Sequence, residues 1–162
     1  MSVKIEVVEV TKPEGCNVIF GVTHFIKSVE DIHEAVVNSV PSAKFGLAFA
    51  EASGHCLIRH EGTDEELRRI AAENLLRIGC GHTFLLVTRN FFPINVLYRL
   101  KQVPEVCTIL AATANPLQIL VAETEQGRGV VAVIDGHKPK GIEDEAHIRE
   151  RREFLRRIGY KF

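Results

Sequence analysis

The chain has 162 residues, of which 46% are hydrophobic and 25% are charged, and its formal net charge at pH 7 is −1. These values predict one globular domain, residues 1–162, with enough apolar side chains for a single core. They exclude the basic stripe that nucleic-acid-binding proteins carry. The sequence shows no secretory signal and no apolar stretch of about 18 residues or more. We therefore expect a cytoplasmic protein that binds neither nucleic acid nor a membrane.

The four cysteines form no C-x-x-C pair, which excludes zinc-ribbon and thioredoxin-like sites. We expect reduced thiols, and we expect Cys107, which lies in an apolar run, to be buried. Arg and Glu are plentiful while Asn and Gln are few, a composition that favours a thermophilic source.

The first part of the chain predicts two strands and a helix. Residues 3–10 alternate apolar and polar side chains, as a half-buried strand does, and a turn at 12–15 leads to a second strand at 17–23. We expect these two strands to pair as a hairpin. The sequence Ser28-Val-Glu-Asp31 is a capping signature that begins a helix.

Two more strands, at 45–52 and 56–61, precede a second helix. This helix begins with a capping box at 63–66 and ends at Gly79, where a C-terminal glycine belongs. Residues 83–88 are almost all apolar, which predicts a central strand buried on both faces.

Pro93 begins a short helix in the second half of the chain. Three apolar strands follow at 106–112, 117–122 and 130–134, the last two joined by a hairpin at Gln126-Gly127. A final helix follows Gly141. The elements together predict an α/β fold: a single-domain mixed β-sheet with helices on both faces, in three α/β/α layers.

The familiar nucleotide-binding motifs do not occur. There is no G-x-x-x-x-G-K-[ST] loop and no G-x-G-x-x-G turn after a strand, which excludes P-loop and Rossmann sites. Polar residues instead mark the ends of the apolar runs between Phe91 and Gly136. Loops at element ends can present polar groups to a ligand, so these positions are the candidate site.

Asn95 and Asn115 each lie near a proline in this region. An amide that both donates and accepts suits a purine edge or a ribose hydroxyl, but both asparagines could equally cap turns. Thr113 is small and would let a ligand approach the backbone. The apolar Phe92 and Ile94 nearby indicate either an interface or a wall on which a base stacks.

Charged groups occur at other strand ends. Glu51 and Glu123 each follow an alanine, and a carboxylate there can bind a ribose diol or a cation, or face solvent at a sheet edge. Arg128 stands between Gly127 and Gly129. Free amides beside a guanidinium can form a phosphate nest, and the alternative is a hairpin turn with a solvated arginine.

His82 follows Gly79-Cys80-Gly81 and enters the most apolar strand. An imidazole in this position could be a general base or a phosphoryl acceptor. The alternative is a core histidine whose hydrogen bonds are satisfied.

Longer segments occur in a fixed order: EASG at 51–54, FPINVL at 92–97, ATANP at 112–116, VAETEQGRG at 121–129 and VIDG at 133–136. With them the chain resembles, over nearly its whole length, the adenosine-specific kinase family of archaea and thermophilic bacteria. The resemblance implies a three-layer α/β domain that binds adenosine and AMP, disfavours ADP and ATP, and carries phosphate on a histidine. His82 matches that histidine, and the EASG motif adds Ser53 to the nucleoside-binding candidates. Ala111 stands where the family pattern often has a cysteine.

Two functions fit these observations. The first is phosphoryl transfer to adenosine through a phosphohistidine at His82, with Mg²⁺ as a cofactor if transfer occurs and no metal site of its own. The second is a non-catalytic sensor or store for adenosine or AMP. A homo-oligomer is compatible with either function, and turnover distinguishes them.

Overall fold

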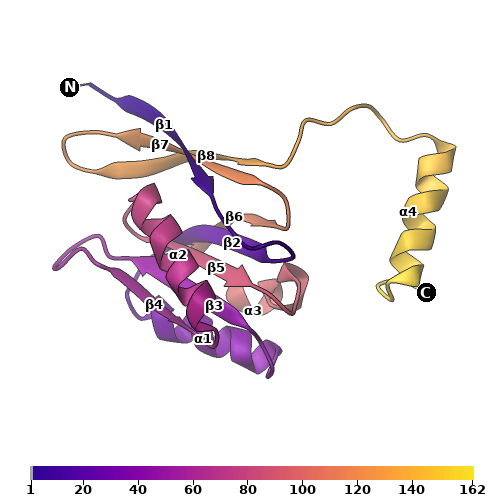
Figure 1. Cartoon of the computed structure of the whole chain (residues 1–162), viewed down its shortest axis with the longest axis horizontal. Coiled ribbons are helices and arrows are strands. Elements are labelled where there is room, and N and C mark those ends of the chain that lie inside the picture. The colour runs from indigo at the N-terminus through magenta and orange to yellow at the C-terminus, as the bar shows by residue number, and fades with distance from the viewer. Residues whose placement is uncertain (1) are drawn as a thin grey trace.

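The computed structural model of the protein describes residues 2–162. Eight strands form two sheets, connected by four α-helices and a single 3-10 turn (Figure 1). The strands are β1 (Lys4–Val10), β2 (Asn17–Thr23), β3 (Phe45–Ala50), β4 (Ile58–Gly62), β5 (Thr83–Thr88), β6 (Val106–Thr113), β7 (Leu117–Glu123) and β8 (Arg128–Asp135). The helices are α1 (Ser28–Ser39), α2 (Glu65–Ile78), the 3-10 turn η1 (Pro93–Asn95), α3 (Leu97–Leu100) and α4 (Glu145–Arg157).

The larger sheet has the strand order β4-β3-β5-β2-β6, and every neighbouring pair in it is antiparallel. β5 lies at its centre and all of its residues are buried, which confirms the prediction for residues 83–88. The smaller sheet has the order β1-β7-β8 and is also antiparallel. The predicted hairpin between β7 and β8 is confirmed.

The expected hairpin between β1 and β2 is wrong. β1 pairs with β7, whereas β2 pairs with β5 and β6. The physical reason lies in the two burial patterns. β2 is buried along nearly its whole length and belongs inside the larger sheet, while β1 is buried on one face only, with Ile5 and Val7 of its other face exposed, and suits a sheet with one side in solvent.

Helices cover both faces of the larger sheet. On one face, α1 and α3 pack around Ile32, Leu86 and Leu100. On the other face, α2 and the smaller sheet pack around Leu75 and Ile119. The predicted α/β fold with helices on both faces is confirmed, and its strands divide between two antiparallel sheets where a single mixed sheet was expected.

Local capping residues set both ends of α2 but not those of α1. The predicted capping box at 63–66 is wrong in one detail, because the Thr63 hydroxyl donates to the Ala43 carbonyl and the next residue caps the helix. Asp64 caps α2 by accepting a hydrogen bond from the Leu67 amide at 3.1 Å, and Gly79 ends the helix with a left-handed φ of 66°. Ser28 is the first residue of α1. Its hydroxyl contacts the Thr23 hydroxyl and leaves the helix without a side-chain cap.

The last part of the chain stands apart from the body. Residues 136–144 form no helix or strand, and α4 beyond them lies away from both sheets (Figure 1). None of the α4 residues is buried. We call residues 136–162 the C-terminal arm.

Candidate functional site

The predicted site residues fall at two opposite ends of the larger sheet. At the histidine end, the chain leaves β3 at Ala50 and enters β5 from His82. At the asparagine end, β6 finishes at Thr113, opposite the beginning of β2. Strands of this length, at about 3.3 Å per residue, separate the two ends by roughly 20 Å. A single nucleoside bound within one chain would therefore contact one end only.

His82 has an unusual backbone. Its φ of 57° is left-handed, which is rare for a residue other than glycine. Its amide donates to the Ala50 carbonyl at 2.8 Å and its carbonyl accepts from the Thr23 amide at 2.9 Å, which fixes it between β3 and β2. At Gly81 a Cβ atom would lie 2.8 Å from the Cβ of Ala52, so this close approach requires glycine. A backbone held in this region costs about 1–3 kcal/mol, and such strain is concentrated at functional sites.

The half-buried imidazole of His82 has two aromatic neighbours. Its ring centroid lies 6.1 Å from that of Phe49, nearly parallel, and 6.0 Å from that of His24, edge to face. His24 is exposed. Two adjacent imidazoles, one half-buried and one open to solvent, can divide the roles of nucleophile and proton acceptor.

Glu51 follows β3 at the same end. Its carboxylate accepts hydrogen bonds from Arg59 Nη2 and from the Leu57 amide, both at 2.9 Å. The Arg59 guanidinium, and after it the Leu57 amide, lower the pKa of this carboxyl. Ser53 is exposed in the following turn, where its carbonyl accepts from the Cys56 amide at 3.2 Å.

An ionic cluster lies beside the histidines. Lys27 pairs with Asp31 and has its ammonium 3.5 Å from Glu105 Oε1. The Glu105 side chain is only 7% exposed, and among residues 2–162 neither of its carboxylate oxygens finds a hydrogen-bond partner. Burial of a carboxylate is costly unless a charge compensates it, so the Lys27 ammonium stabilises Glu105. The same ammonium, as the first cause, lowers the pKa of Asp31.

The backbone joins this cluster to the histidines. The Glu105 carbonyl accepts a hydrogen bond from the His24 amide at 2.8 Å, and also one from the Thr23 hydroxyl at 3.1 Å. Glu105, Thr23, His24 and His82 are thus linked in one continuous set of contacts at the histidine end.

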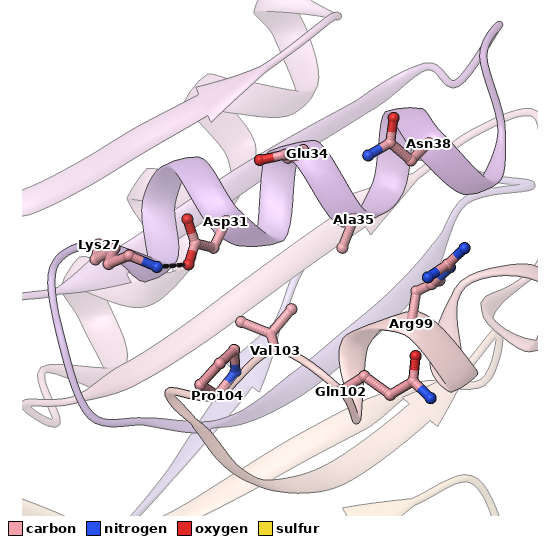
Figure 2. Close-up of a pocket in the computed structure, with 9 residues that line it drawn as sticks. All are labelled: Lys27, Asp31, Glu34, Ala35, Asn38, Arg99, Gln102, Val103 and Pro104. Carbon is pink, nitrogen blue, oxygen red and sulfur yellow. Dashed lines mark hydrogen bonds and ion pairs between the residues drawn. The ribbon is translucent and has the colours of Figure 1, made fainter.

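Lys27 lines two hollows. Figure 2 shows the first, about 440 Å³ in volume, which runs between α1 and the α3 region with Lys27 and Asp31 at one end. Its other lining residues are Glu34, Ala35, Asn38, Arg99, Gln102, Val103 and Pro104. The second hollow, about 520 Å³, lies between the start of α1 and β4. Lys27 and Arg59 supply cations to it, Glu30 and Glu61 supply carboxylates, and Ile26 and Ile58 supply apolar surface. Such a mixed lining can contact both the polar and the apolar parts of a nucleoside.

A third hollow at the histidine end, about 470 Å³, brings together Glu51, Gly127 and Arg128. These residues come from distant parts of the sequence, and the buried Cys80 also lines the hollow. Burial raises the pKa of the Cys80 thiol.

Arg128 already has protein partners for each of its nitrogens. Its Nε donates to Glu123 at 2.7 Å, its Nη2 pairs with Glu6, and its Nη1 donates to the Arg77 carbonyl at 3.0 Å. Glu123, as the first cause, raises the pKa of the guanidinium. The side chain therefore joins the smaller sheet to the end of α2, and the phosphate-binding role of Arg128 with its flanking glycines, including Gly129, stays a prediction.

At the asparagine end, the polar groups bind one another. Asp135 accepts hydrogen bonds from the Thr113 hydroxyl at 2.7 Å and from Asn115 Nδ2 at 3.3 Å, and the Asn115 amide donates to the Thr113 hydroxyl at 2.9 Å. Asn95 accepts from the Phe92 amide at 2.9 Å and so fixes η1. These are the turn-capping contacts that the sequence left open as an alternative, and the nucleoside-binding role of Asn95, Thr113 and Asn115 stays a prediction.

Sequence reasoning missed His24, Lys27 and Glu105. His24 and Lys27 lie in a short connection between a strand and a helix, and Glu105 lies in the turn before β6. Nothing local distinguishes them from solvated loop residues. One signal in the sequence could have identified them. Ionisable residues are frequent just after the predicted strand 17–23 and just before the predicted strand 106–112.

The cysteine expectation is corrected for one residue. Cys107 is exposed rather than buried, because β6 is an edge strand whose outer positions face solvent. Within the described part of the chain, no group of three or more His, Cys, Asp or Glu residues is arranged to hold a metal ion. None of the helices in residues 2–162 has the length and apolar character needed to cross a bilayer.

The fold is that of an α/β protein, and the candidate site around His82 lies at the strand ends of its larger sheet. The family model described as adenosine specific kinase matches residues 8–161, and the chain belongs to this family. Among solved structures, the chain is similar to the PH1918 protein from Pyrococcus horikoshii OT3, with 45% sequence identity, 99% of each chain covered and a TM-score of 0.95. The comparison with curated proteins gave no match. Family membership assigns the chain an adenosine-related function.

Proposed function

We propose that this protein phosphorylates adenosine, and that His82 carries the phosphoryl group. The observation that supports this most directly is the His82 backbone, which is held in a strained conformation while its half-buried ring neighbours His24. Backbone strain of this kind is concentrated at functional sites, which supports a functional role for His82.

The transfer takes place in two steps. In the first, a lone pair on an imidazole nitrogen of His82 attacks the terminal phosphorus of a phosphoanhydride donor. The N–P bond forms as the P–O bond of the anhydride breaks, the shortened phosphate leaves with the bonding electrons, and the second ring nitrogen gives up its proton to water. In the second step, water returns a proton to the second ring nitrogen, the 5′-hydroxyl oxygen of adenosine attacks the phosphorus, and the N–P bond breaks with its electrons returning to His82, which leaves as a neutral imidazole. His24 takes the hydroxyl proton, and AMP is the product.

The surrounding charges stabilise the transferred group. Phosphoryl transfer depends mostly on positioning and on neutralising charge. Lys27 and Arg59 line the hollow beside β4 and can bind phosphate oxygens, and Ile26 and Ile58 offer apolar surface to the base. Arg59 holds the Glu51 carboxylate in place, and this carboxylate can accept a hydrogen bond from a ribose hydroxyl. Among residues 2–162, no group of three or more His, Cys, Asp or Glu side chains is arranged to hold a metal ion, so no step is assigned to Mg²⁺.

A label-chase experiment tests this function. The protein is incubated with ³²P-labelled ATP, ADP or pyrophosphate, and the label is located by digestion at neutral or alkaline pH, since phosphohistidine is labile in acid. We expect label on the peptide that contains His82, and we expect added unlabelled adenosine to remove it as labelled AMP.

The alternative function is a non-catalytic adenosine or AMP sensor, which needs the same hollow but no nucleophile. Under this alternative, no donor labels the protein, while adenosine and AMP still raise the melting temperature by mass action. A label elsewhere than His82, or a label that adenosine does not remove, would also contradict the proposed mechanism.

A further inference from the structure

The hollow between α1 and the α3 region takes no part in the proposed reaction. We call it the α1–α3 hollow, and its volume is about 440 Å³. Figure 2 shows that it runs along α1, with Lys27 and Asp31 at one end and the Asn38 and Arg99 side chains at the other. Between these ends, the side chains of Ala35 and Val103 point toward each other. The hollow therefore has two polar ends and an apolar middle.

The end at Asp31 carries excess negative charge. Two carboxylates share the Lys27 ammonium there, because Asp31 forms an ion pair with it and Glu105 Oε1 lies 3.5 Å from it. Glu105 is buried, and neither of its carboxylate oxygens accepts a hydrogen bond among residues 2–162. The exposed Glu34, one turn further along α1, also lines the hollow and adds a third carboxylate. One ammonium does not balance three carboxylates, so this end attracts a further cation.

The end at Arg99 has the opposite charge. The Arg99 side chain comes from α3, a helix that contains no acidic residue, and it is exposed. None of the ion pairs formed within residues 2–162 includes it. A guanidinium binds a carboxylate through two parallel hydrogen bonds, and the amide of Asn38 at the same end can donate a third. This end therefore suits an anion of the carboxylate type.

The distance between the two ends limits the ligand. Asp31 and Asn38 are about two helical turns apart on α1, and each turn advances a helix by about 5.4 Å, so the ends are separated by roughly 10 Å. A single amino acid is too short to place its ammonium and its carboxylate at both ends. An extended peptide of about three residues covers this length, at about 3.3 Å per residue.

We propose that the α1–α3 hollow binds a short peptide of about three residues whose two ends are free. The N-terminal ammonium pairs with Asp31, and the C-terminal carboxylate pairs with Arg99. The middle of the peptide lies against Ala35 and Val103, where small side chains can be accommodated. A dicarboxylate would have to pair with Lys27, whose charge Asp31 and Glu105 already compensate. The proposal does not depend on the phosphoryl-transfer mechanism.

Calorimetric titration of the full-length protein with tri-alanine tests the proposal, at low ionic strength because salt screens exposed charges. N-acetyl-tri-alanine lacks the ammonium, tri-alanine amide lacks the carboxylate, and glutarate is a dicarboxylate. We expect tri-alanine to bind with a dissociation constant of about 1 mM or below. We expect each of the other three molecules to bind at least about tenfold more weakly, because each lacks one of the two charges.

Two variants assign each charge to its end of the hollow. Arg99→Met removes the guanidinium, and Asp31→Asn removes the carboxylate charge; both side chains reach solvent, so circular dichroism should not change. In Arg99→Met, tri-alanine and its amide should differ in affinity by less than about threefold, and in Asp31→Asn the same should hold for tri-alanine and its acetylated form. Lys101→Met is the matched control, since Lys101 is exposed just after α3, does not line the hollow and should leave the wild-type preferences intact.

Four results would overturn the proposal. The first is a wild type that does not bind tri-alanine at about 10 mM. The second is equal binding of the free and the blocked peptides, which would indicate recognition of a peptide backbone such as an internal segment of a protein. The third is tighter binding of glutarate than of tri-alanine, which would indicate a site for dianions. The fourth is an Arg99→Met variant that still prefers the free carboxylate, which would place the peptide elsewhere.

Discussion

Polar residues occur at both ends of the larger sheet, but their side chains have different surroundings at the two ends. At the asparagine end, Thr113, Asn115 and Asp135 satisfy one another's hydrogen bonds and hold the turns in place. At the histidine end, His82 is strained, and the buried carboxylate of Glu105 has a compensating charge but no hydrogen bond. Polar groups that satisfy each other build the fold. At the histidine end, the half-buried imidazole of His82 beside the exposed His24 is the part that a ligand can reach.

The largest expected effect separates the two ends by activity. His82→Asn removes the proposed nucleophile, so we expect the rate of AMP formation to fall at least about 1,000-fold while most of the adenosine affinity is kept. Asn95→Ala, at the other end, should leave the rate within about twofold and lower only stability. Steady-state kinetics and calorimetric titration with adenosine measure both quantities. A reversed pattern, with Asn95→Ala inactive and His82→Asn active, would place the reaction at the asparagine end.

The second prediction concerns the packing that holds His82. In Gly81→Ala the new methyl group would lie 2.8 Å from the Cβ of Ala52, so the backbone must move. We expect a loss of about 1–3 kcal/mol in the free energy of unfolding, together with reduced activity. Urea denaturation gives the first value. Gly141→Ala is the control, because no atom lies within 4 Å of its Cβ position and its stability should not change.

The third prediction tests whether the asparagine end is structural. Asp135→Ala removes the acceptor shared by Thr113 and Asn115 and leaves the buried Thr113 hydroxyl without it. We expect the free energy of unfolding to fall by about 1–2 kcal/mol, with adenosine affinity unchanged. Asp135→Asn keeps an acceptor oxygen and should recover part of the loss. A strong loss of adenosine affinity in Asp135→Ala, without unfolding, would give this end a binding role.

The smallest effect is a pH dependence at the histidine end. The folded-state pKa of Glu51 is below its usual value, chiefly because of the Arg59 guanidinium. The resulting stabilisation is fully present above the ordinary carboxyl pKa of about 4.3 and is lost as the pH falls through the lowered folded-state pKa. We therefore expect Arg59→Met to be less stable than the wild type at pH 7 and to approach it in acid, as urea titrations at successive pH values would show.

Arg69→Met is the matched control for this pH dependence. Arg69 forms an exposed ion pair with Glu73 one turn away on α2, and such pairs contribute little. Its stability difference from the wild type should be small at every pH. An Arg59→Met curve parallel to that of the wild type would show that Arg59 does not set the Glu51 titration.

Most elements of the fold could be predicted from the sequence because their signals are local. The apolar run at β5, the terminal glycine of α2 and the hairpin at Gln126-Gly127 all depend on neighbours within a few residues. The β1–β2 pairing was wrong because strand pairing depends on which faces are buried, and that is settled by the whole core. The same limit applies to Cys107, whose exposure follows from the edge position of β6.

For the candidate site too, some features follow from the local sequence and others only from the tertiary structure. The sequence by itself determined that His82 and Glu51 stand at the ends of apolar strands, since burial patterns and glycines mark those ends along the chain. Only the tertiary structure brought His24 beside His82, buried Glu105 next to Lys27, and placed Asn115 at the opposite end of the sheet. These relations join residues that strand order and register bring together or separate, so they are set by the packing of the whole domain and not by any local segment.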